Sequence, residues 1–535
     1  MEPLNTSKDF HKCGLVYAFT FWALFAVYCI YYQIQTYCIW LHRRSNDKSK
    51  KKRIPSIHAY VPRFLNRVVK IPFITEFIEV KHIIGLFLFM GLNVVFIIFS
   101  PFQVEAGSTW TLQSVGLMDR RAAYVGMVNW SFVFVLGTRN TVVTRMSGLT
   151  FESLIPFHRW IARIGWCEFM THFVWRIMRG YEKSGTARGA LFLDIEQGTG
   201  TVAMIGFFIL FITSFEWIRR RIFWFFYVCH IVGIIVAIIA SCWHEVGCFY
   251  YFIPAVLLWF FDRVWRSFQS WCIRTETLRT EVHGEVVAID FKYDLLSHYR
   301  PGQYVFVSMV DRAKNALWQY TQWHPFTISA ASRSKKEASV HIKALGDKTK
   351  AIAQALRDQR RMNIRVDGMY GPRLMYQDHP TILLFAAGIG ITPALTLITD
   401  CVNKRSAGAR GIVTERVHLV WAVRQINEVE PFMETIVGWY TSCQEAAFPI
   451  KIYLDLYVTQ SKETVKDHWL YGFQECTITY GRRPDIGQCM EEIQTKLSDA
   501  DDVWVHTCGS NQFMSQVINE AVKRHWHHHH ETFEF

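Results

Sequence analysis

The chain has 535 residues, of which 51% are hydrophobic and 19% are charged. This length suffices for about three domains, and the apolar residues gather in the first half, which excludes a wholly soluble protein. The net charge of +13 does not indicate a nucleic-acid partner, because much of the excess lies in basic stretches beside apolar runs, such as 43–53, where membrane topology and anionic lipid account for it.

About 20 mostly apolar residues are enough to cross a bilayer. The loops between such runs fall into two alternating sets, which carry 16 and 7 Lys or Arg residues. Cytosolic loops are the richer ones, so we expect the amino terminus outside and the second half of the chain in the cytosol. The sequence predicts seven spans before residue 268, at 14–41, 83–102, 122–138, 157–177, 201–218, 222–243 and 248–266.

Two of these spans carry histidine pairs with the same spacing: His158 and His172 on the fourth span, and His230 and His244 on the sixth. Fourteen residues of α-helix rise about 21 Å and come within about 40° of a whole number of turns. Each pair therefore lies on one helix face, near opposite membrane surfaces. Because the two spans run in the same direction, His158 is expected to face His230, and His172 to face His244. Haem iron accepts two axial histidines, which favours electron transfer, so we expect two stacked haem sites.

The thirteen cysteines include no CxxC pair, so neither a zinc site nor a thioredoxin-like motif is suggested. Cys242 and Cys248 flank a predicted outer loop. A disulfide and two unlinked thiols are both open there.

After residue 266 the pattern changes to strands and turns, beginning with a strand predicted at 282–291. An Arg-Pro-Gly-Gln-Tyr turn at 300–304 leads into another strand and is followed by His-Pro-Phe-Thr-Ile-Ser at 324–329. Together these motifs are typical of a flavin site, because an extended segment can offer Thr327 and its backbone amides to the isoalloxazine edge. Gly346 to Thr349 opens a predicted helix, which suits either the FAD pyrophosphate or an ordinary helix cap.

The last third has the strand–turn–helix rhythm of nucleotide binding. A buried strand at 381–385 precedes Ala-Gly-Ile-Gly-Ile-Thr-Pro at 387–393, whose glycines either admit phosphate or form a structural turn. A strand at 418–423 ends in Arg424, a candidate for the 2′-phosphate of NADPH or a solvated side chain. Another strand, at 503–507, ends in Cys508 and Gly509 at the carboxyl edge of a predicted parallel sheet. Ligands bind at that edge, although a lone cysteine is more often a buried small hydrophobe.

Taken together, these motifs and the doubled histidine spacing resemble the ferric reductase and NADPH oxidase family of flavocytochromes. The resemblance implies a transmembrane helical domain at 1–268, a ferredoxin-reductase-like β-barrel for FAD at 269–375 and an α/β Rossmann-like NADPH domain at 376–535. It also implies site residues: the four histidines as axial ligands of two haems b; His324, Pro325, Phe326, Thr327, Ile328, Ser329 and Thr349 at FAD; Gly388, Gly390, Thr392, Pro393, Arg424, Cys508 and Gly509 at NADPH; and Cys508 with Phe535 at the reacting centre.

This chain departs from the family pattern at two positions, with Ala387 and Ser510 where the family usually has glycine and proline. Its last five residues, 531–535, look like the family's aromatic tail, which covers the flavin. The four histidines at 527–530 thus belong to the native sequence, and we expect them to be solvated, with weak metal affinity as the alternative.

The resemblance implies a multi-pass membrane oxidoreductase, in the plasma membrane or else the endoplasmic reticulum. It would pass electrons from cytosolic NADPH to ferric or cupric chelates. Superoxide production from dioxygen is the alternative. A haem or metal uptake component, or a signalling receptor, with a reductase-like shell is a third hypothesis, from a different class. The sequence does not give the oligomeric state.

Overall fold

The computed structural model describes residues 7–44, 62–71, 75–99, 115–311, 319, 322–360, 362–409, 412–446, 448–461, 465, 467–497 and 502–532. The chain divides into two compact units. The first comprises Met1–Tyr37 and Ile84–Trp265 and is helical, and the second comprises Cys38–Ile83 and Arg266–Phe535 and holds the β-sheets. Phe535 lies outside the described residues.

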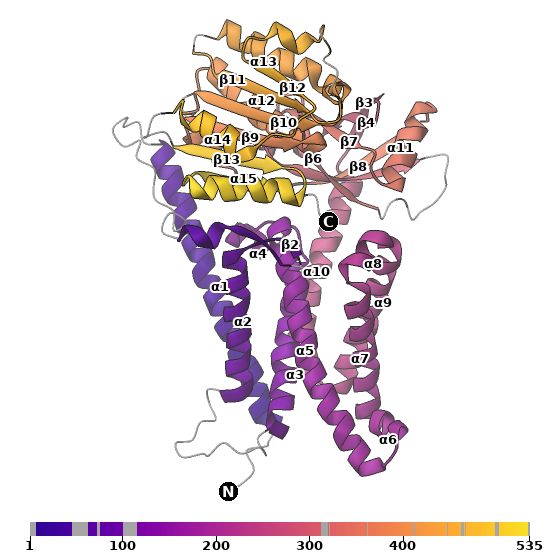
Figure 1. Cartoon of the computed structure of the whole chain (residues 1–535). Coiled ribbons are helices and arrows are strands. Elements are labelled where there is room, and N and C mark those ends of the chain that lie inside the picture. The colour runs from indigo at the N-terminus through magenta and orange to yellow at the C-terminus, as the bar shows by residue number, and fades with distance from the viewer. Residues whose placement is uncertain are drawn as a thin grey trace. The chain divides into compact units, whose positions relative to one another are not determined.

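Long helices form the apolar half of the chain (Figure 1). Seven of them in the described ranges match the seven expected spans, and five (α1, α2, α7, α9 and α10) are long and apolar enough to cross a membrane by length and composition alone. The bounds are α1 (Ser7–Arg44), α2 (Val80–Phe99), α3 (Val115–Leu136), α5 (Phe151–Ser184), α7 (Ile195–Thr213), α9 (Phe223–His244) and α10 (Gly247–Cys272), with the short helices α4 (Val142–Ser147), α6 (Ala187–Phe192) and α8 (Glu216–Arg221) between them.

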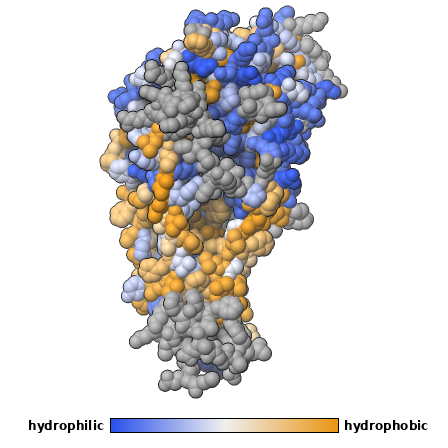
Figure 2. All heavy atoms as spheres, turned by 90° about the vertical axis from the view of Figure 1, so that its left-hand side faces the viewer, coloured by the Kyte–Doolittle hydropathy of each residue, from blue (hydrophilic) through white to orange (hydrophobic). Residues whose placement is uncertain are grey.

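Helices α3 and α5 are the more polar pair because several of their polar side chains point inward. Asn129 of α3 is fully buried and Glu168 of α5 is 6% exposed. The outer surface is apolar instead: Phe19 of α1 and Leu88 of α2 are each 71% exposed, and Figure 2 shows apolar side chains covering this face of the helical unit. Such a distribution is the one that a lipid solvent requires.

Local signals set the ends of α5, the helix that carries His158 and His172. Thr150 and Ser153 form a reciprocal capping box at its start. Gly185 ends it with φ of 67°, the left-handed conformation that glycine adopts without a Cβ penalty.

The first large sheet of the second unit is antiparallel, and β3 and β8 at the two ends of its order lie next to each other, so that the sheet curls into a barrel. Its order is β3-β4-β7-β6-β5-β8, and α11 (Asp347–Arg357) connects β7 to β8. The strands are β3 (Thr275–His283), β4 (Val286–Tyr293), β5 (Tyr304–Asp311), β6 (His324–Ser332), β7 (Glu337–Lys343) and β8 (Met362–Tyr370).

The single strand predicted at 282–291 was wrong. Gly284 has φ of 58° and makes a tight turn there, so that β3 and β4 pair as an antiparallel hairpin. Apolar residues continue to alternate through the turn, so the periodicity of the sequence does not reveal the turn.

The second large sheet is parallel and contains the strands predicted at 381–385, 418–423 and 503–507. Its order is β12-β11-β10-β9-β13-β14, so the chain leaves β9 toward one edge and returns to β13 on its other side. Ligands of open α/β sheets bind where the order reverses in this way. The elements are β9 (Thr381–Ala387), α12 (Thr392–Ser406), β10 (Arg416–Val423), α13 (Met433–Glu445), β11 (Lys451–Val458), β12 (Cys476–Tyr480), α14 (Ile486–Gln494), β13 (Val503–Cys508), α15 (Asn511–Lys523) and β14 (His527–Glu531).

A small hairpin, β1 (Val68–Ile71) and β2 (Thr75–Glu79), belongs to the second unit and packs on α15. The side-chain amide of Asn519 pairs with Val68 as a neighbouring strand would. Its Oδ1 accepts from the Val68 N–H at 2.9 Å, and its Nδ2 donates to the Val68 carbonyl at 3.0 Å. Val68 is buried against Ile518 and Val522. The Asn519 amide and the apolar contacts of Val68 therefore attach the hairpin to α15.

We predict that Asn519→Ala loosens this hairpin, because it leaves both backbone groups of Val68 without their partner. Each unsatisfied buried group costs about 1–3 kcal/mol. Hydrogen exchange followed by mass spectrometry should show faster exchange across 68–79. Gln516→Ala is the control, since Gln516 is exposed on the same helix. Equal exchange in both variants would contradict the attachment.

Candidate functional site

The four histidines come together in the two pairs that their spacing predicts. His158 of α5 and His230 of α9 have ring centres 6.5 Å apart, and those of His172 and His244 are 6.2 Å apart. Helices α5, α7 and α9 run alongside one another (Figure 1). Two metal–nitrogen bonds of about 2 Å each, plus the half-width of each ring, add to about 6 Å. Each pair therefore has room for one metal ion between its rings.

Hydrogen bonds at Nδ1 orient three of the four rings. His158 donates to the carbonyl of Val133 at 2.9 Å, and His244 donates to that of Glu196 at 2.7 Å. Because a carbonyl only accepts, Nδ1 carries the proton in both rings, which leaves the Nε2 lone pair for a metal. The Nδ1 of His230 is buried without a hydrogen-bond partner.

The third anchor is a carboxylate. Asp119 of α3 accepts from Nδ1 of His172 at 3.1 Å and also forms a 3.1 Å ion pair with Arg176. A carboxylate behind a ligating imidazole fixes its tautomer and raises its basicity. Asp119 was not predicted from the sequence, because residues 103–121 were expected to form an outer loop, whereas α3 begins at Val115.

Gly200 of α7 leaves room for the ring of His244. A Cβ at this position would lie 2.9 Å from Nδ1 and Cε1 of His244. Nothing in the sequence distinguished it, since it lies in an ordinary apolar helix.

The predicted flavin segment forms strand β6, which pairs with β5. Thr327 is buried and donates a 2.7 Å hydrogen bond to Oε1 of Glu531. Ile328 lies in the barrel core. Ser329 bonds within the barrel, to the carbonyl of Ser339 at 2.9 Å and to Nδ1 of His341 at 2.6 Å.

The neighbouring residues of the segment differ in environment. His324, Pro325 and Phe326 are half-buried at the start of β6. On α11, Thr349 donates to the carbonyl of Gly346 at 2.9 Å and accepts from its N–H at 3.1 Å. Its hydroxyl thus caps its own helix, as the simpler interpretation of this motif expected.

The glycine turn after β9 lies where the sheet order reverses. Gly388 has φ of 54°, and its carbonyl accepts from the indole of Trp421 at 3.0 Å. A Cβ on Gly390 would overlap the carbonyl of Cys508. Thr392 and Pro393 begin α12, whose amino terminus is suited to phosphate.

Cys508 ends β13 and is fully buried, next to Ala386 on one side and Glu531 on the other. Burial raises the pKa of its thiol well above the usual value, and Glu531 raises it further. Cys508 is therefore a neutral thiol at physiological pH. A Cβ on Gly509 would lie 2.9 Å from that of Ala387. Arg424 is exposed just past β10.

Glu531 is a further residue whose individual contact was not predicted from the sequence. Glu531 accepts a hydrogen bond from Thr327 of β6. It lies at the end of β14, opposite Cys508 of β13, and so joins the barrel to the parallel sheet. A carboxylate two residues before an aromatic residue near the carboxyl terminus was the available signal. Of this tail, only the aromatic Phe535 was predicted at the reacting centre.

The histidines at 527–530 are not a solvated run, contrary to expectation. They form β14, the edge strand of the parallel sheet, and are half-buried. Nδ1 of His529 lies 3.1 Å from Nδ1 of His506. Burial lowers the pKa of His506 to about 3, so this pair is neutral. Cys242 and Cys248 are both unlinked.

Three family models match the chain in the predicted order: the ferric reductase like transmembrane component at 122–241, an FAD-binding domain at 273–374 and the ferric reductase NAD binding domain at 379–522. The chain belongs to the ferric reductase and NADPH oxidase family. Its FAD-binding and NAD-binding domains correspond to the antiparallel barrel and to the parallel sheet.

Curated relatives agree with this assignment. Ferric reduction oxidase 5 of Arabidopsis thaliana is 26% identical over 65% of this chain and 49% of its own length. Probable ferric reduction oxidase 1 of the same plant is 24% identical over 80% and 62%, and its respiratory burst oxidase homolog protein B is 28% identical over 41% and 30%. The chain spans about half the length of the curated ferric reduction oxidases that it matches.

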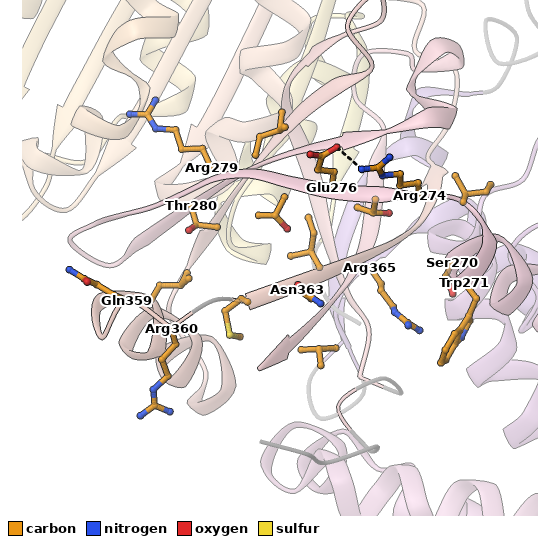
Figure 3. A pocket seen from close by; sticks show the side chains of 18 residues that line it. Ser270, Trp271, Arg274, Glu276, Arg279, Thr280, Gln359, Arg360, Asn363 and Arg365 are labelled. Atoms are coloured by element: carbon orange, nitrogen blue, oxygen red, sulfur yellow. Dashed lines mark ion pairs between the residues drawn. The ribbon is translucent and has the colours of Figure 1, made fainter. Parts of the chain in front are cut away.

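A basic pocket of about 890 Å³ opens in the FAD-binding domain of this family member, between β3, β8 and the end of α11 (Figure 3). None of the residues expected at FAD lines this pocket. The pocket lies where β3 and β8 meet, and in the strand order of the barrel this point is opposite β6. Arg274 forms a 3.6 Å ion pair with Glu276 there. The lining also includes Arg279, Arg360 and Arg365.

We predict that Gly390→Ala weakens nucleotide binding and destabilises the NAD-binding domain. The new methyl group meets the backbone of Cys508, and overpacking of this kind costs about 1–3 kcal/mol. Thermal unfolding and the rate of flavin reduction by NADPH measure the two effects. Gly438→Ala is the matched control, because a Cβ on that glycine of α13 meets nothing within 4 Å. Wild-type behaviour of the Gly390 variant would show that the turn is looser than described.

Proposed function

We propose that this chain transfers electrons across a membrane, from cytosolic NADPH through FAD and two haems b to ferric or cupric chelates. One observation carries the proposal: two pairs of histidines, each spaced to hold one iron ion, occur in a chain with FAD-binding and NAD-binding domains. Two strong axial ligands saturate a haem iron, which favours electron transfer over the binding of oxygen at the iron.

The donor set fits haem. His158, His172, His230 and His244 are expected to coordinate through Nε2, because Nδ1 is already bonded in three of them. When bound, FAD can accept two electrons from NADPH as a hydride and pass them on one at a time, and each haem carries a single electron. Fourteen residues separate the histidines on each helix, so one pair lies toward each membrane surface.

The soluble residues position the nucleotides. Thr327 and the amides of 324–329 are expected at the isoalloxazine edge, with Glu531 and Cys508 beside the place where nicotinamide approaches. Because Cys508 is a buried neutral thiol, its role is to pack and orient rather than to attack. Arg424, at the carboxyl edge of the sheet, is the candidate for the 2′-phosphate.

The distribution of Lys and Arg supports an amino terminus outside and nucleotide domains in the cytosol. We place the protein in the plasma membrane, with the endoplasmic reticulum as the alternative. Domain boundaries at 1–268, 269–375 and 376–535 and a role for Phe535 over the flavin are part of the same proposal.

Metal chelates are favoured as the acceptor because the relatives that cover most of the chain are named ferric reduction oxidases. Dioxygen is the second candidate, favoured by the similarity to a respiratory burst oxidase homolog. A transport component or receptor with a reductase-like shell is the third, and purified protein without FAD and without low-spin haem would support it.

The deciding experiment measures both products in proteoliposomes supplied with NADPH and a ferric chelate. Trapped iron(II) is followed with ferrozine, and superoxide is followed separately, each with and without superoxide dismutase. We expect iron reduction that dismutase does not change. Iron reduction that disappears with dismutase would mean that dioxygen is the direct acceptor.

We also predict that Asp119→Asn weakens the outer haem site. Loss of the carboxylate behind His172 lowers the basicity of that ligand, and changes of this kind reduce metal affinity about 10–100-fold. The haem content per chain should fall toward one, measured by the pyridine haemochrome assay. Asp194→Asn is the control, since Asp194 caps α7 and asparagine caps equally well. Full haem content in the Asp119 variant would remove Asp119 from the site.

A further inference from the structure

A carboxyl group that belongs to neither histidine pair lies buried among the membrane helices. Glu168 of α5 is 6% exposed. Its Oε2 accepts from Nδ2 of Asn129 at 2.8 Å, whereas its Oε1 is buried without a hydrogen-bond partner. An ionisable side chain within a membrane helix is costly to bury and usually marks a functional site.

Glu168 belongs to a polar network that joins four helices. The hydroxyl of Tyr17 on α1 donates to Oδ1 of Asn129 on α3 at 2.8 Å. Nδ2 of Asn129 also lies 3.4 Å from Oδ1 of Asn93 on α2. Tyr17, Asn93 and Asn129 are each at most 2% exposed, and Nδ2 of Asn93 has no hydrogen-bond partner.

Structural stability does not explain this network. A partly satisfied buried polar cluster is less stable than apolar packing of the same volume. No basic side chain pairs with Glu168 among the residues that the structure describes. The titratable groups that interact with Glu168 are Tyr17 and Cys167, the residue before Glu168 in the chain. Helices α2 and α3 contribute the two uncharged amides, and α7 faces this part of α5 with Phe207, which packs on Phe169.

The position of Glu168 relates it to the electron path. It lies ten residues after His158 and four before His172, or about 15 Å and about 6 Å along the helix axis. The carboxyl group is therefore between the levels of the two histidine pairs and nearer the outer one. Charges in such a poorly polarisable interior interact strongly.

We propose that Glu168 is a proton-binding site. Its carboxylate takes up one proton when an electron reaches the outer haem, the one expected between His172 and His244. The proposal rests on the proposed function, which supplies the electron from NADPH. A hydronium ion of the solvent supplies the proton: one of its O–H bonds breaks to leave water, and a new O–H bond forms on Oε1 of Glu168. Electron and proton charges cancel, so each transfer places no net charge in the membrane interior. Asn129 holds the carboxyl group in place and is in turn held by Tyr17, so both are positioning residues.

The test is a spectroelectrochemical titration of the haems in the purified holoprotein at several pH values. A carboxylate opposes the arriving electron and a neutral carboxyl does not. The wild-type outer haem should therefore lose midpoint potential as pH rises, by up to about 59 mV per pH unit, the value for a tenfold change in a one-electron equilibrium. Glu168→Gln imitates the protonated group, so its potential should stay high and independent of pH.

Glu182→Gln is the matched control, because Glu182 is exposed on the same helix, and it should keep the wild-type slope. Redox-difference infrared spectra give a second reading: a protonated-carboxyl band should form on reduction, shift in Glu168→Asp and vanish in Glu168→Gln. A wild-type slope in Glu168→Gln, or no such band in the wild type, overturns the inference while leaving the haems in place. Purified protein without haem overturns the proposed function as well.

Discussion

The helical unit depends on the distance between paired imidazoles on α5 and α9. The ring centres lie 6.2 and 6.5 Å apart, a separation at which the two imidazoles of each pair can hold one metal ion between them. Keeping this distance requires rigid neighbours. Gly206 of α7 lies against the backbone of Ala237 on α9, where a Cβ would come within 2.8 Å of the Ala237 nitrogen. Close backbone packing of this kind replaces the hydrophobic effect, which is absent between helices in lipid.

Polar groups on α3 and α5 face inward and serve the same core. Val133 and Asp119 orient imidazoles, and Asn129 holds Glu168. The two helices are consequently more polar than their neighbours, although they lie among membrane spans. Helices of this kind can lie in a membrane because their polar side chains face the helical core while their outer faces remain apolar.

In the second unit, the constraint is the reversal of strand order between β9 and β13. It places the glycine turn after β9 against Cys508, so that Gly390 admits no side chain. The edge strand β14 then brings Glu531 to Thr327, which links the parallel sheet to the barrel. Nucleotide and flavin motifs thus meet through two side chains from distant parts of the sequence.

The sequence by itself determined the local elements: spans from apolar length, histidine faces from a 14-residue spacing, and strand ends from the turn residues after 385, 423 and 507. Periodicity suffices for these features because they depend on neighbours in the chain. Only the tertiary structure decided that Asp119 supports His172, that Glu531 reaches Thr327, that 527–530 is an edge strand and that Asn129 joins Tyr17 to Glu168. Each of these contacts joins residues tens to hundreds of positions apart, and no local pattern encodes which distant group will satisfy a buried polar atom.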